Sequence, residues 1–486
     1  MPHTSYLIPY TSYLIPYTSC LKQLLFIFIF FFTLVIFSCK KETIITSSDA
    51  RISVSADTIR FDTVFTSVGS ITQSFKIKNE NNQKLQFSSI SLQGGAASSF
   101  KINVNGIVGP EVKDIEVEAK DSIYVFVTVS LNPNISPLPF IIQDSIEINY
   151  NGNKNLVQLE SWGQNANFLR SRIITGKVTW TNNLPYVIIG GLSVDTNATL
   201  TIEKGCRIYL HADAPVIIDG TLLLNGEKYD STRIYFKGDR LDDPYRNFPA
   251  GWPGIYFRGS SKDNVLNWAV IQNAYQGIVT EQPSVNSNPR VILNQCIIDN
   301  IYDAGILAIK SSINANNCLI SNCGKNIQLI NGGKYQFNHC TVPSFTSTYQ
   351  SHKEPVLFVS NNIKQNNIIT SSDMTANFRN CIFWAESGIV DDEVVTSKQG
   401  NTIFSVNFEN CLWRVKTPPA NVVATNIIIN QLPVFDSINS QKHFFNFRLK
   451  NSSPAINKGV NTGLSLDLDG NPRAVGLPDL GAFELQ

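Results

Sequence analysis

The chain of 486 residues is poor in charge, methionine and histidine. Only 16% of its residues are charged, 39 basic against 38 acidic, and there are 2 methionines and 5 scattered histidines. Nucleic-acid binding needs a net basic face that releases counterions, so this neutrality argues against a nucleic-acid partner. No CxxC or Cys/His spacing supports zinc, and GxSxG, GxGxxG and phosphate-loop motifs are missing. No catalytic motif therefore names an activity.

What the chain does contain is apolar and amide side chains. Hydrophobic residues make up 43% of it, enough for a core, and about 50 residues are asparagine. Frequent Ile, Val and Phe together with Asn favour extended β structure with tight polar turns over helix. The length favours two domains over one.

The first residues predict an export signal. The heptad TSYLIPY occurs twice, at 4–10 and 11–17. Two heptads are too short for a solenoid, so we interpret them as a duplication in the DNA or as the result of a start codon assigned too far upstream. A targeting extension is the alternative. Lys22 then precedes Leu24–Phe37, which is apolar except for Thr33. A bilayer span needs roughly 20 such residues, so this run suits the hydrophobic region of a signal peptide better.

The next residues, Ile36-Phe37-Ser38-Cys39, resemble a bacterial lipoprotein signal, although Phe37 is bulkier than that pattern prefers. The resemblance implies that Cys39 is diacylated and becomes the N-terminus, since two acyl chains anchor a protein stably. We therefore expect a leader over 1–38, a tether over 39–50, and an exported protein held to a bacterial membrane, with the outer membrane favoured. An uncleaved N-terminal anchor is the alternative.

Residues 51–165 alternate with period two and contain no cysteine, as in Ser122–Val129. About seven short strands separated by Asn- and Gly-rich turns predict an antiparallel β-sandwich. The segment resembles the immunoglobulin-like modules of cilia-associated and bacterial envelope proteins, through Gly69-Ser70, Phe75–Asn79, Leu85–Ile90 and Val157–Gly163. We expect a spacer here, with a partner-binding sandwich as the alternative.

An internal repeat dominates residues 166–486. Its anchor recurs after 27, 22, 22, 41 and 30 residues, at Ala269, Cys296, Cys318, Cys340, Cys381 and Cys411. A second half-repeat follows at Gly277-Ile278-Val279, Gly305-Ile306-Leu307 and Asn326–Leu329. A period near 22 with three short strands per turn predicts a parallel β-helix, and the longer spacings predict loops inserted on one face.

The cysteines and the asparagines that recur at equivalent positions of this repeat both have structural explanations. Seven cysteines remain after the leader and Cys39, and we expect buried thiols stacked inside the coil, with interior disulfides as the alternative. Asn273, Asn300 and Asn322 predict a turn ladder of hydrogen-bonded amides, with ligand contact as the alternative.

Two groups of segments carry a further resemblance. They are the early coils Leu200–Ile208 and Gly251–Ile255, and the C-terminal segments Ser453–Gly459, Asp467–Arg473 and Asp479–Glu484. Through them, roughly Arg172–Gln486 resembles the right-handed parallel β-helices of the pectate-lyase-like superfamily, and its end resembles a bacterial cell-surface signature of such helices. The expected fold is all-β, an immunoglobulin-like sandwich followed by this single-stranded helix with loop insertions. We expect Arg473 to pair with a carboxylate and close the last coil.

A calcium loop is the alternative for Asp467-x-Asp469-Gly470, but its downstream ligands and the Glu at loop position 12 are missing. We therefore expect no resident metal or cofactor, with Ca²⁺ as the alternative.

The resemblance leaves catalysis open. Lyases of this fold need a Lys or Arg base and a neutraliser for a uronate, and hydrolases need paired carboxylates. The candidates at expected outward positions are Asp299, Asp303, Lys310, Lys325 and His339, besides Asp242-Asp243 and Asp391–Glu393.

Two functions follow from these residues. One is a monomeric envelope lipoprotein that binds glycan or a surface protein. The other is a polysaccharide lyase or glycoside hydrolase. An enzyme should bring two or more of Asp299, Asp303, Lys310, Lys325 and His339 within about 6 Å in a groove, whereas a binder should show an aromatic strip without convergent charges.

Overall fold

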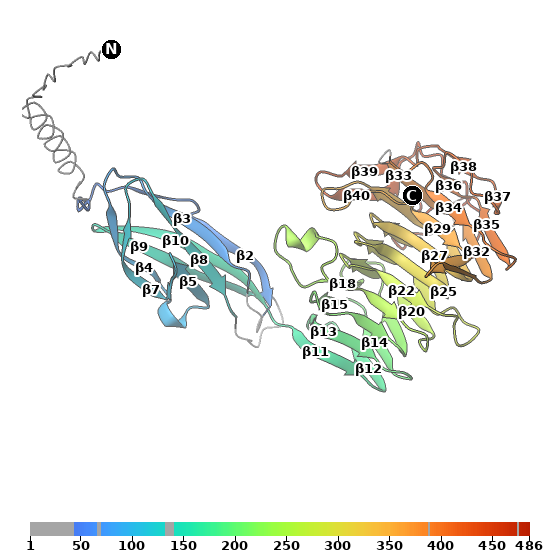
Figure 1. Cartoon of the computed structure of the whole chain (residues 1–486), viewed down its shortest axis with the longest axis horizontal. Helices are drawn as coiled ribbons and strands as arrows, with labels where there is room; N and C mark the ends of the chain where they lie inside the picture. Colours follow the sequence, from blue (N-terminus) through green and yellow to red (C-terminus); the bar gives the residue numbers. More distant parts are fainter. Residues whose placement is uncertain (1–42, 66–69, 132–139, 387–388, 474–475) are drawn as a thin grey trace, which may run out of the picture. The chain divides into compact units, whose positions relative to one another are not determined.

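The computed structural model describes residues 43–65, 70–131, 140–386, 389–473 and 476–486. The predicted leader and Cys39 lie outside these residues. The chain folds into two compact units, one built mainly from residues 71–128 and 143–159 and the other from residues 160–486 (Figure 1). In the described part no helix is long and apolar enough to cross a membrane.

The first unit is a β-sandwich of two five-stranded sheets, which confirms the predicted antiparallel architecture. One sheet has the order β1(Ile52–Val54), β3(Gln73–Asn79), β8(Ser122–Val129), β5(Phe100–Val104), β6(Ile107–Gly109). The other has the order β2(Thr58–Phe65), β10(Asn153–Gln164), β9(Phe140–Tyr150), β4(Leu85–Leu92), β7(Glu111–Val117). The count exceeds the predicted seven because strands of three residues, such as β1 and β6, are too short to show alternation.

The second unit is a stack of parallel strands in a single 26-stranded sheet, which begins with β11(Asn167–Ile174) and β13(Tyr186–Val194). Each coil except the last two contributes one strand to each of three rows, as predicted, and in the described residues the last two coils lack a strand in the third row. Row A contains β12(Lys177–Trp180), β14(Thr199–Glu203), β17(Thr221–Asn225), β20(Asn264–Asn267), β23(Val291–Asn294), the second halves of β25(Ala304–Asn316) and β27(Lys325–Asn338), β32(Met374–Arg379), β35(Phe404–Glu409) and β37(Val423–Thr425).

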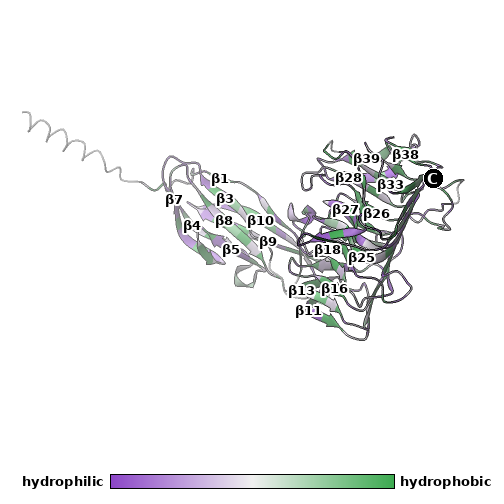
Figure 2. Ribbon diagram, turned by 45° about the vertical axis from the view of Figure 1, so that its right-hand side comes forward, coloured by the Kyte–Doolittle hydropathy of each residue, from purple (hydrophilic) through white to green (hydrophobic). Residues whose placement is uncertain are grey.

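Row B contains β15(Arg207–Leu210), β18(Ile234–Gly238), β21(Ala269–Gln272), β24(Ile297–Asp299), β26(Leu319–Ser321), β28(Thr341–Phe345), β33(Ile382–Glu386), β36(Leu412–Trp413) and β38(Ile428–Ile429). Row C contains β16(Val216–Ile218), β19(Ile255–Phe257), β22(Ile278–Glu281), the first halves of β25 and β27, β29(Leu357–Ser360) and β34(Val394–Ser397). Buried residues alternate with more exposed ones along strands such as β14 and β17, and hydrophobic and hydrophilic segments lie together in the stack (Figure 2).

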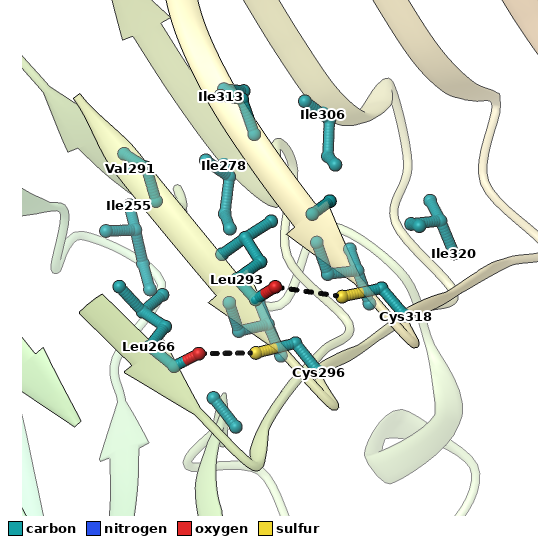
Figure 3. Close-up of a cluster of buried hydrophobic side chains, with 14 of the residues drawn as sticks. Ile255, Leu266, Ile278, Val291, Leu293, Cys296, Ile306, Ile313, Cys318 and Ile320 are labelled. Carbon is teal, nitrogen blue, oxygen red and sulfur yellow. Dashed lines mark hydrogen bonds between the residues drawn. The ribbon is translucent and has the colours of Figure 1, made fainter. Parts of the chain in front are cut away.

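The interior of the stack is a column of aliphatic and cysteine side chains (Figure 3). The Sγ atom of Cys296 lies 3.2 Å from the backbone oxygen of Leu266, and that of Cys318 lies 3.7 Å from the oxygen of Leu293. All seven cysteines in the described ranges are buried free thiols, which confirms the thiol prediction.

The turn between rows A and B accounts for some of the asparagines, because Asn occupies it in three of the six coils with an anchor residue. The residue before the anchor has a left-handed backbone in successive coils, with φ of 51° at Asn317, 54° at Asn380 and 52° at Asn410. Asparagine tolerates this conformation better than other residues with a Cβ atom, so the repeated turn selects for it.

The amide ladder is only partly where it was predicted. Asn300 donates to Asn273 Oδ1 at 2.8 Å, but Asn322 donates instead to Asp299 at 3.3 Å. A longer ladder runs along the end of row A, at 2.9, 3.0 and 2.9 Å, through Asn267, Asn294, Asn316 and Asn338.

The prediction that the inserted loops lie on one face is wrong. The longest spacing contains two insertions, residues 346–356 between rows B and C and residues 361–373 between rows C and A. Stacking constrains the strands and the tight A–B turn, whereas the other two corners face solvent and both can extend.

The C-terminal segment packs on the outer face of row B. The hairpin β39(Phe435–Asn439)–β40(Phe444–Leu449) and the residues after it cover Leu319, Phe345, Ile382 and Trp384. Arg473 pairs with Glu484 at 3.0 Å, as predicted, but its Nε atom donates to Asn317 at 2.9 Å. The pair therefore pins the segment to the middle of the stack and does not close the last coil.

Candidate functional site

One column of outward side chains on row B is left uncovered by the C-terminal segment. Because alternate residues of a strand face outward, pairing of successive coils aligns Tyr209 with Lys237, Gln272 with Asp299, and Asp299 with Ser321. These five side chains line a cleft in the second unit, which we name the row B cleft. The column parallel to it, which includes Ile297 and Leu319, packs against the C-terminal segment.

Cation–π contacts lie at one end of this cleft. The guanidinium of Arg207 lies 4.0 Å from the ring centroid of Tyr235, and Lys237 Nζ lies 5.4 Å from that of Tyr209. Burial lowers the pKa of Lys237, and among the described residues it has no ion-pair or hydrogen-bond partner. Lys237 is therefore a cation available to a ligand.

Among the other cations of the cleft, Lys228 lies 4.9 Å from the ring centroid of Tyr229, and three arginines are held by polar contacts. Arg240 pairs with Asp242 at 2.7 Å and Arg448 with Asp469 at 2.6 Å, while Arg233 donates to the backbone oxygen of Leu468 at 2.7 Å. These contacts hold the loop after β18 and the C-terminal segment as walls of the cleft.

Asp299 lies at the other end of the column. Ser321 Oγ donates to it at 2.6 Å and Asn322 at 3.3 Å. Burial raises the pKa of Asp299, and these hydrogen bonds and the nearby His443 oppose that shift. One cleft thus contains an acid whose pKa is raised and a base whose pKa is lowered, the combination that supports general acid–base chemistry.

Two of the predicted residues meet elsewhere. Lys325 Nζ lies 3.1 Å from Asp303 Oδ1, and Gln276 donates to Asp303 Oδ2 at 3.0 Å. The pair lies at the corner between rows B and C, near Tyr275 and Tyr302, whose rings stack at 5.4 Å. The separation of these two charges meets the limit of about 6 Å that we expected for an enzyme. However, they form an ion pair with each other, and they lie outside the row B cleft.

The expected outward position of His339 is wrong. Its side chain is fully buried, with Nδ1 3.2 Å from the backbone oxygen of Asp479 and Nε2 2.8 Å from Asn380 Nδ2. Burial lowers the pKa of His339 to about 3. It occupies the left-handed turn position of its coil, and the C-terminal segment covers that turn.

The acidic clusters of the sequence serve structural contacts. Glu393 was expected at the surface but is fully buried, 3.0 Å from His352 Nε2. Asp392 accepts the backbone N–H groups of Lys416 and Thr417 at 2.6 and 2.7 Å. In the other cluster, Asp242 and Asp243 pair with Arg240 and Arg246.

In the described ranges no three His, Cys, Asp or Glu side chains converge as metal ligands. Asp467 accepts the N–H groups of Asp469, Asn471 and Glu484 at 2.9, 2.7 and 2.9 Å, so its carboxylate organises a turn. Lys310, the remaining candidate, lines a separate groove at the corner between rows C and A.

Asp299 is thus the one predicted candidate in the row B cleft, and Lys237, Tyr209 and Tyr235 were missed. The sequence did contain a pattern that could have identified these three residues. Arg-Ile-Tyr at 207–209 and Tyr-Phe-Lys at 235–237 place polar and aromatic residues at alternate positions of strands otherwise apolar.

Residues 175–342 match a family model described as right-handed β-helix region. No curated protein sequence matches the chain. Among solved structures, a family 123 glycoside hydrolase from Clostridium perfringens is similar at 10% identity over 24% of this chain, with a TM-score of 0.18, and the chain spans only 30% of that enzyme.

Two further likenesses are the ASH/PapD-like domain of human CEP192 and the periplasmic chaperone SfaE. The first has 12% identity over 26% of this chain and 92% of the domain, with a TM-score of 0.18. The second has 9% identity over 28% of this chain and 67% of the chaperone, with a TM-score of 0.17. The family match and the three stacked rows of strands make residues 175–342 a right-handed β-helix region.

Proposed function

We propose that the β-helix binds an acidic glycan in the row B cleft and that acylated Cys39 anchors the protein to a bacterial membrane. The observation that carries the glycan proposal is Lys237, a partly buried ammonium beside the Tyr209 ring without an anionic partner among the described residues. A uronate carboxylate or a sulfate ester would pair with that ammonium, and a sugar ring would lie against an aromatic ring.

An enzyme acting on the same glycan is the second candidate. The specific observation in its favour is the opposite direction of the pKa shifts of Lys237 and Asp299, both caused by burial. A lysine with a lowered pKa serves as the base of a β-elimination, and a carboxyl with a raised pKa serves as an acid. The Asp303–Lys325 pair provides no comparable free base.

Retention on immobilised polygalacturonate, alginate and heparin, with dextran as the uncharged reference, tests the binding proposal. Lys237→Ala should lower retention of at least one acidic glycan about tenfold or more, because a charge-assisted contact is lost. Lys177→Ala, an exposed lysine on β12, is the matched control. Equal retention by the protein and Lys237→Ala would exclude this site.

The same samples distinguish a binder from an enzyme. Unsaturated or new reducing ends that appear with the unmodified protein and disappear in Asp299→Asn would establish a lyase or hydrolase. Retention without cleavage supports a binding lipoprotein. Neither retention nor cleavage of any glycan would leave a protein partner as the function.

A further inference from the structure

The side chains on the outer face of row A change from apolar to amide partway along the stack. Strand pairing places one outward residue of each coil in register, in the order Thr201, Leu223, Val265, Ile292, Asn314, Gln336, Asn377, Asn407. The position is apolar in three consecutive coils and an amide in the next four. The row therefore does not require amides for folding.

A groove begins where the amides begin. It has a volume of about 830 Å³ and is lined by the row A strands of β25, β27 and β32, the loop at residues 283–289 and the turn at Ser372-Asp373. That volume lies in the range of roughly 300–1,000 Å³ typical of ligand sites. We name it the amide groove. Lys310 and Lys334 bring positive charge to it, and Asp373 brings negative charge.

Two of its amides are left without partners. Asn314 Oδ1 is buried and accepts no hydrogen bond, and Gln336 makes none with any described residue. Two positions further along the same strands, Asn316 and Asn338 hydrogen-bond to each other at 2.9 Å. Amides at coil spacing can therefore pair here, and a buried acceptor left unpaired costs stability until a ligand donor reaches it.

We propose that the amide groove binds a neutral oligosaccharide, separately from the acidic glycan of the row B cleft. A sugar hydroxyl donates and accepts, as does a carboxamide, so one hydroxyl satisfies Asn314 Oδ1 while its neighbour accepts from Gln336. Asp373 offsets one of the two lysines, and amide side chains outnumber charged ones in the lining, which favours an uncharged chain over a polyanion. The open groove accommodates several sugar residues along the stack.

Titration of the full chain in detergent with maltohexaose, mannohexaose and chitohexaose tests this proposal. The double variant Asn314→Leu/Gln336→Leu removes both free amides, and Leu223 shows that the row accepts leucine. We expect at least one hexasaccharide to bind, with a Kd about tenfold or more higher for the double variant, as the loss of two hydrogen bonds predicts.

Thr201→Leu, in the same row but outside the groove, is the matched control and should leave the Kd unchanged. Lys237→Ala should also leave the Kd for the hexasaccharide unchanged. The proposal for the row B cleft and the proposal for the amide groove can therefore fail independently of each other. Gln336→Ala, at an exposed position, replaces the double variant if its Tm falls. Binding of no hexasaccharide, or an unchanged Kd in a folded groove variant, would overturn the proposal.

Discussion

Glu484 shows how the C-terminal segment depends on single charges. The Glu484 side chain is 2% exposed, and its carboxylate pairs with Arg473 and accepts the N–H of Asp479 at 3.0 Å. Burial raises the pKa of Glu484 from 4.5 to about 7, and the nearby Arg473 opposes that shift. The folded protein therefore holds this proton more tightly than the unfolded chain does.

Glu484→Gln tests this link between protonation and stability. The wild-type contribution is fully present below the unfolded pKa and is lost as pH rises through the folded pKa of about 7. Glutamine does not titrate, so the free energy of unfolding of the variant relative to wild type should rise between pH 5 and pH 8, by at most about 3 kcal/mol. Denaturant melts at both pH values measure the difference, and a pH-independent difference would contradict it.

At the scale of the element, the row A ladder is a continuous hydrogen-bonded feature. Asn294 donates to Asn267 and accepts from Asn316, so its side chain joins two steps. Asn225 occupies the same register two coils before Asn294, but it donates to Glu203 at 3.2 Å and is exposed.

Asn294→Ala should lower the free energy of unfolding by about 1–3 kcal/mol, because two partly buried amides lose a partner. Asn225→Ala should change it by less than about 0.5 kcal/mol, as is usual for surface positions. Chemical denaturation of both variants provides the comparison. Equal losses would mean that the ladder stabilises no more than a surface amide does.

The local repeat made the β-helix predictable, and contacts distant in sequence limited the prediction of the site. Ile278, Ile306 and Ile327 align as the repeat indicates, and the cysteine column lies inside. His339 is buried by residues more than a hundred positions later in the chain, which no period reveals. Lys237 was overlooked because its importance comes from what surrounds it, the Tyr209 ring and the lack of a partner.

At the scale of the whole molecule, the membrane anchor is the main expectation that lies outside the described residues. Metabolic labelling with radioactive palmitate should mark the wild-type protein and not Cys39→Ala, since the acylated thiol is removed. Cys20→Ala is the matched control, because Cys20 belongs to the predicted leader and should leave the label intact. Label that persists in Cys39→Ala, or none on wild type, would refute the lipoprotein assignment.

The alternation along row A has a consequence for how such a protein diversifies. Inward residues such as Ile313 and Phe337 are buried in the core, while the side chains of their outward neighbours Asn314 and Gln336 hydrogen-bond to no described residue. Along one strand, alternate residues therefore have separate roles: the inward residues form the core, and the outward residues form the surface where we propose that a ligand binds. Substitutions at the outward positions can change the surface of row A without a compensating change inside, so the proposed ligand site can diversify while the coil keeps its fold.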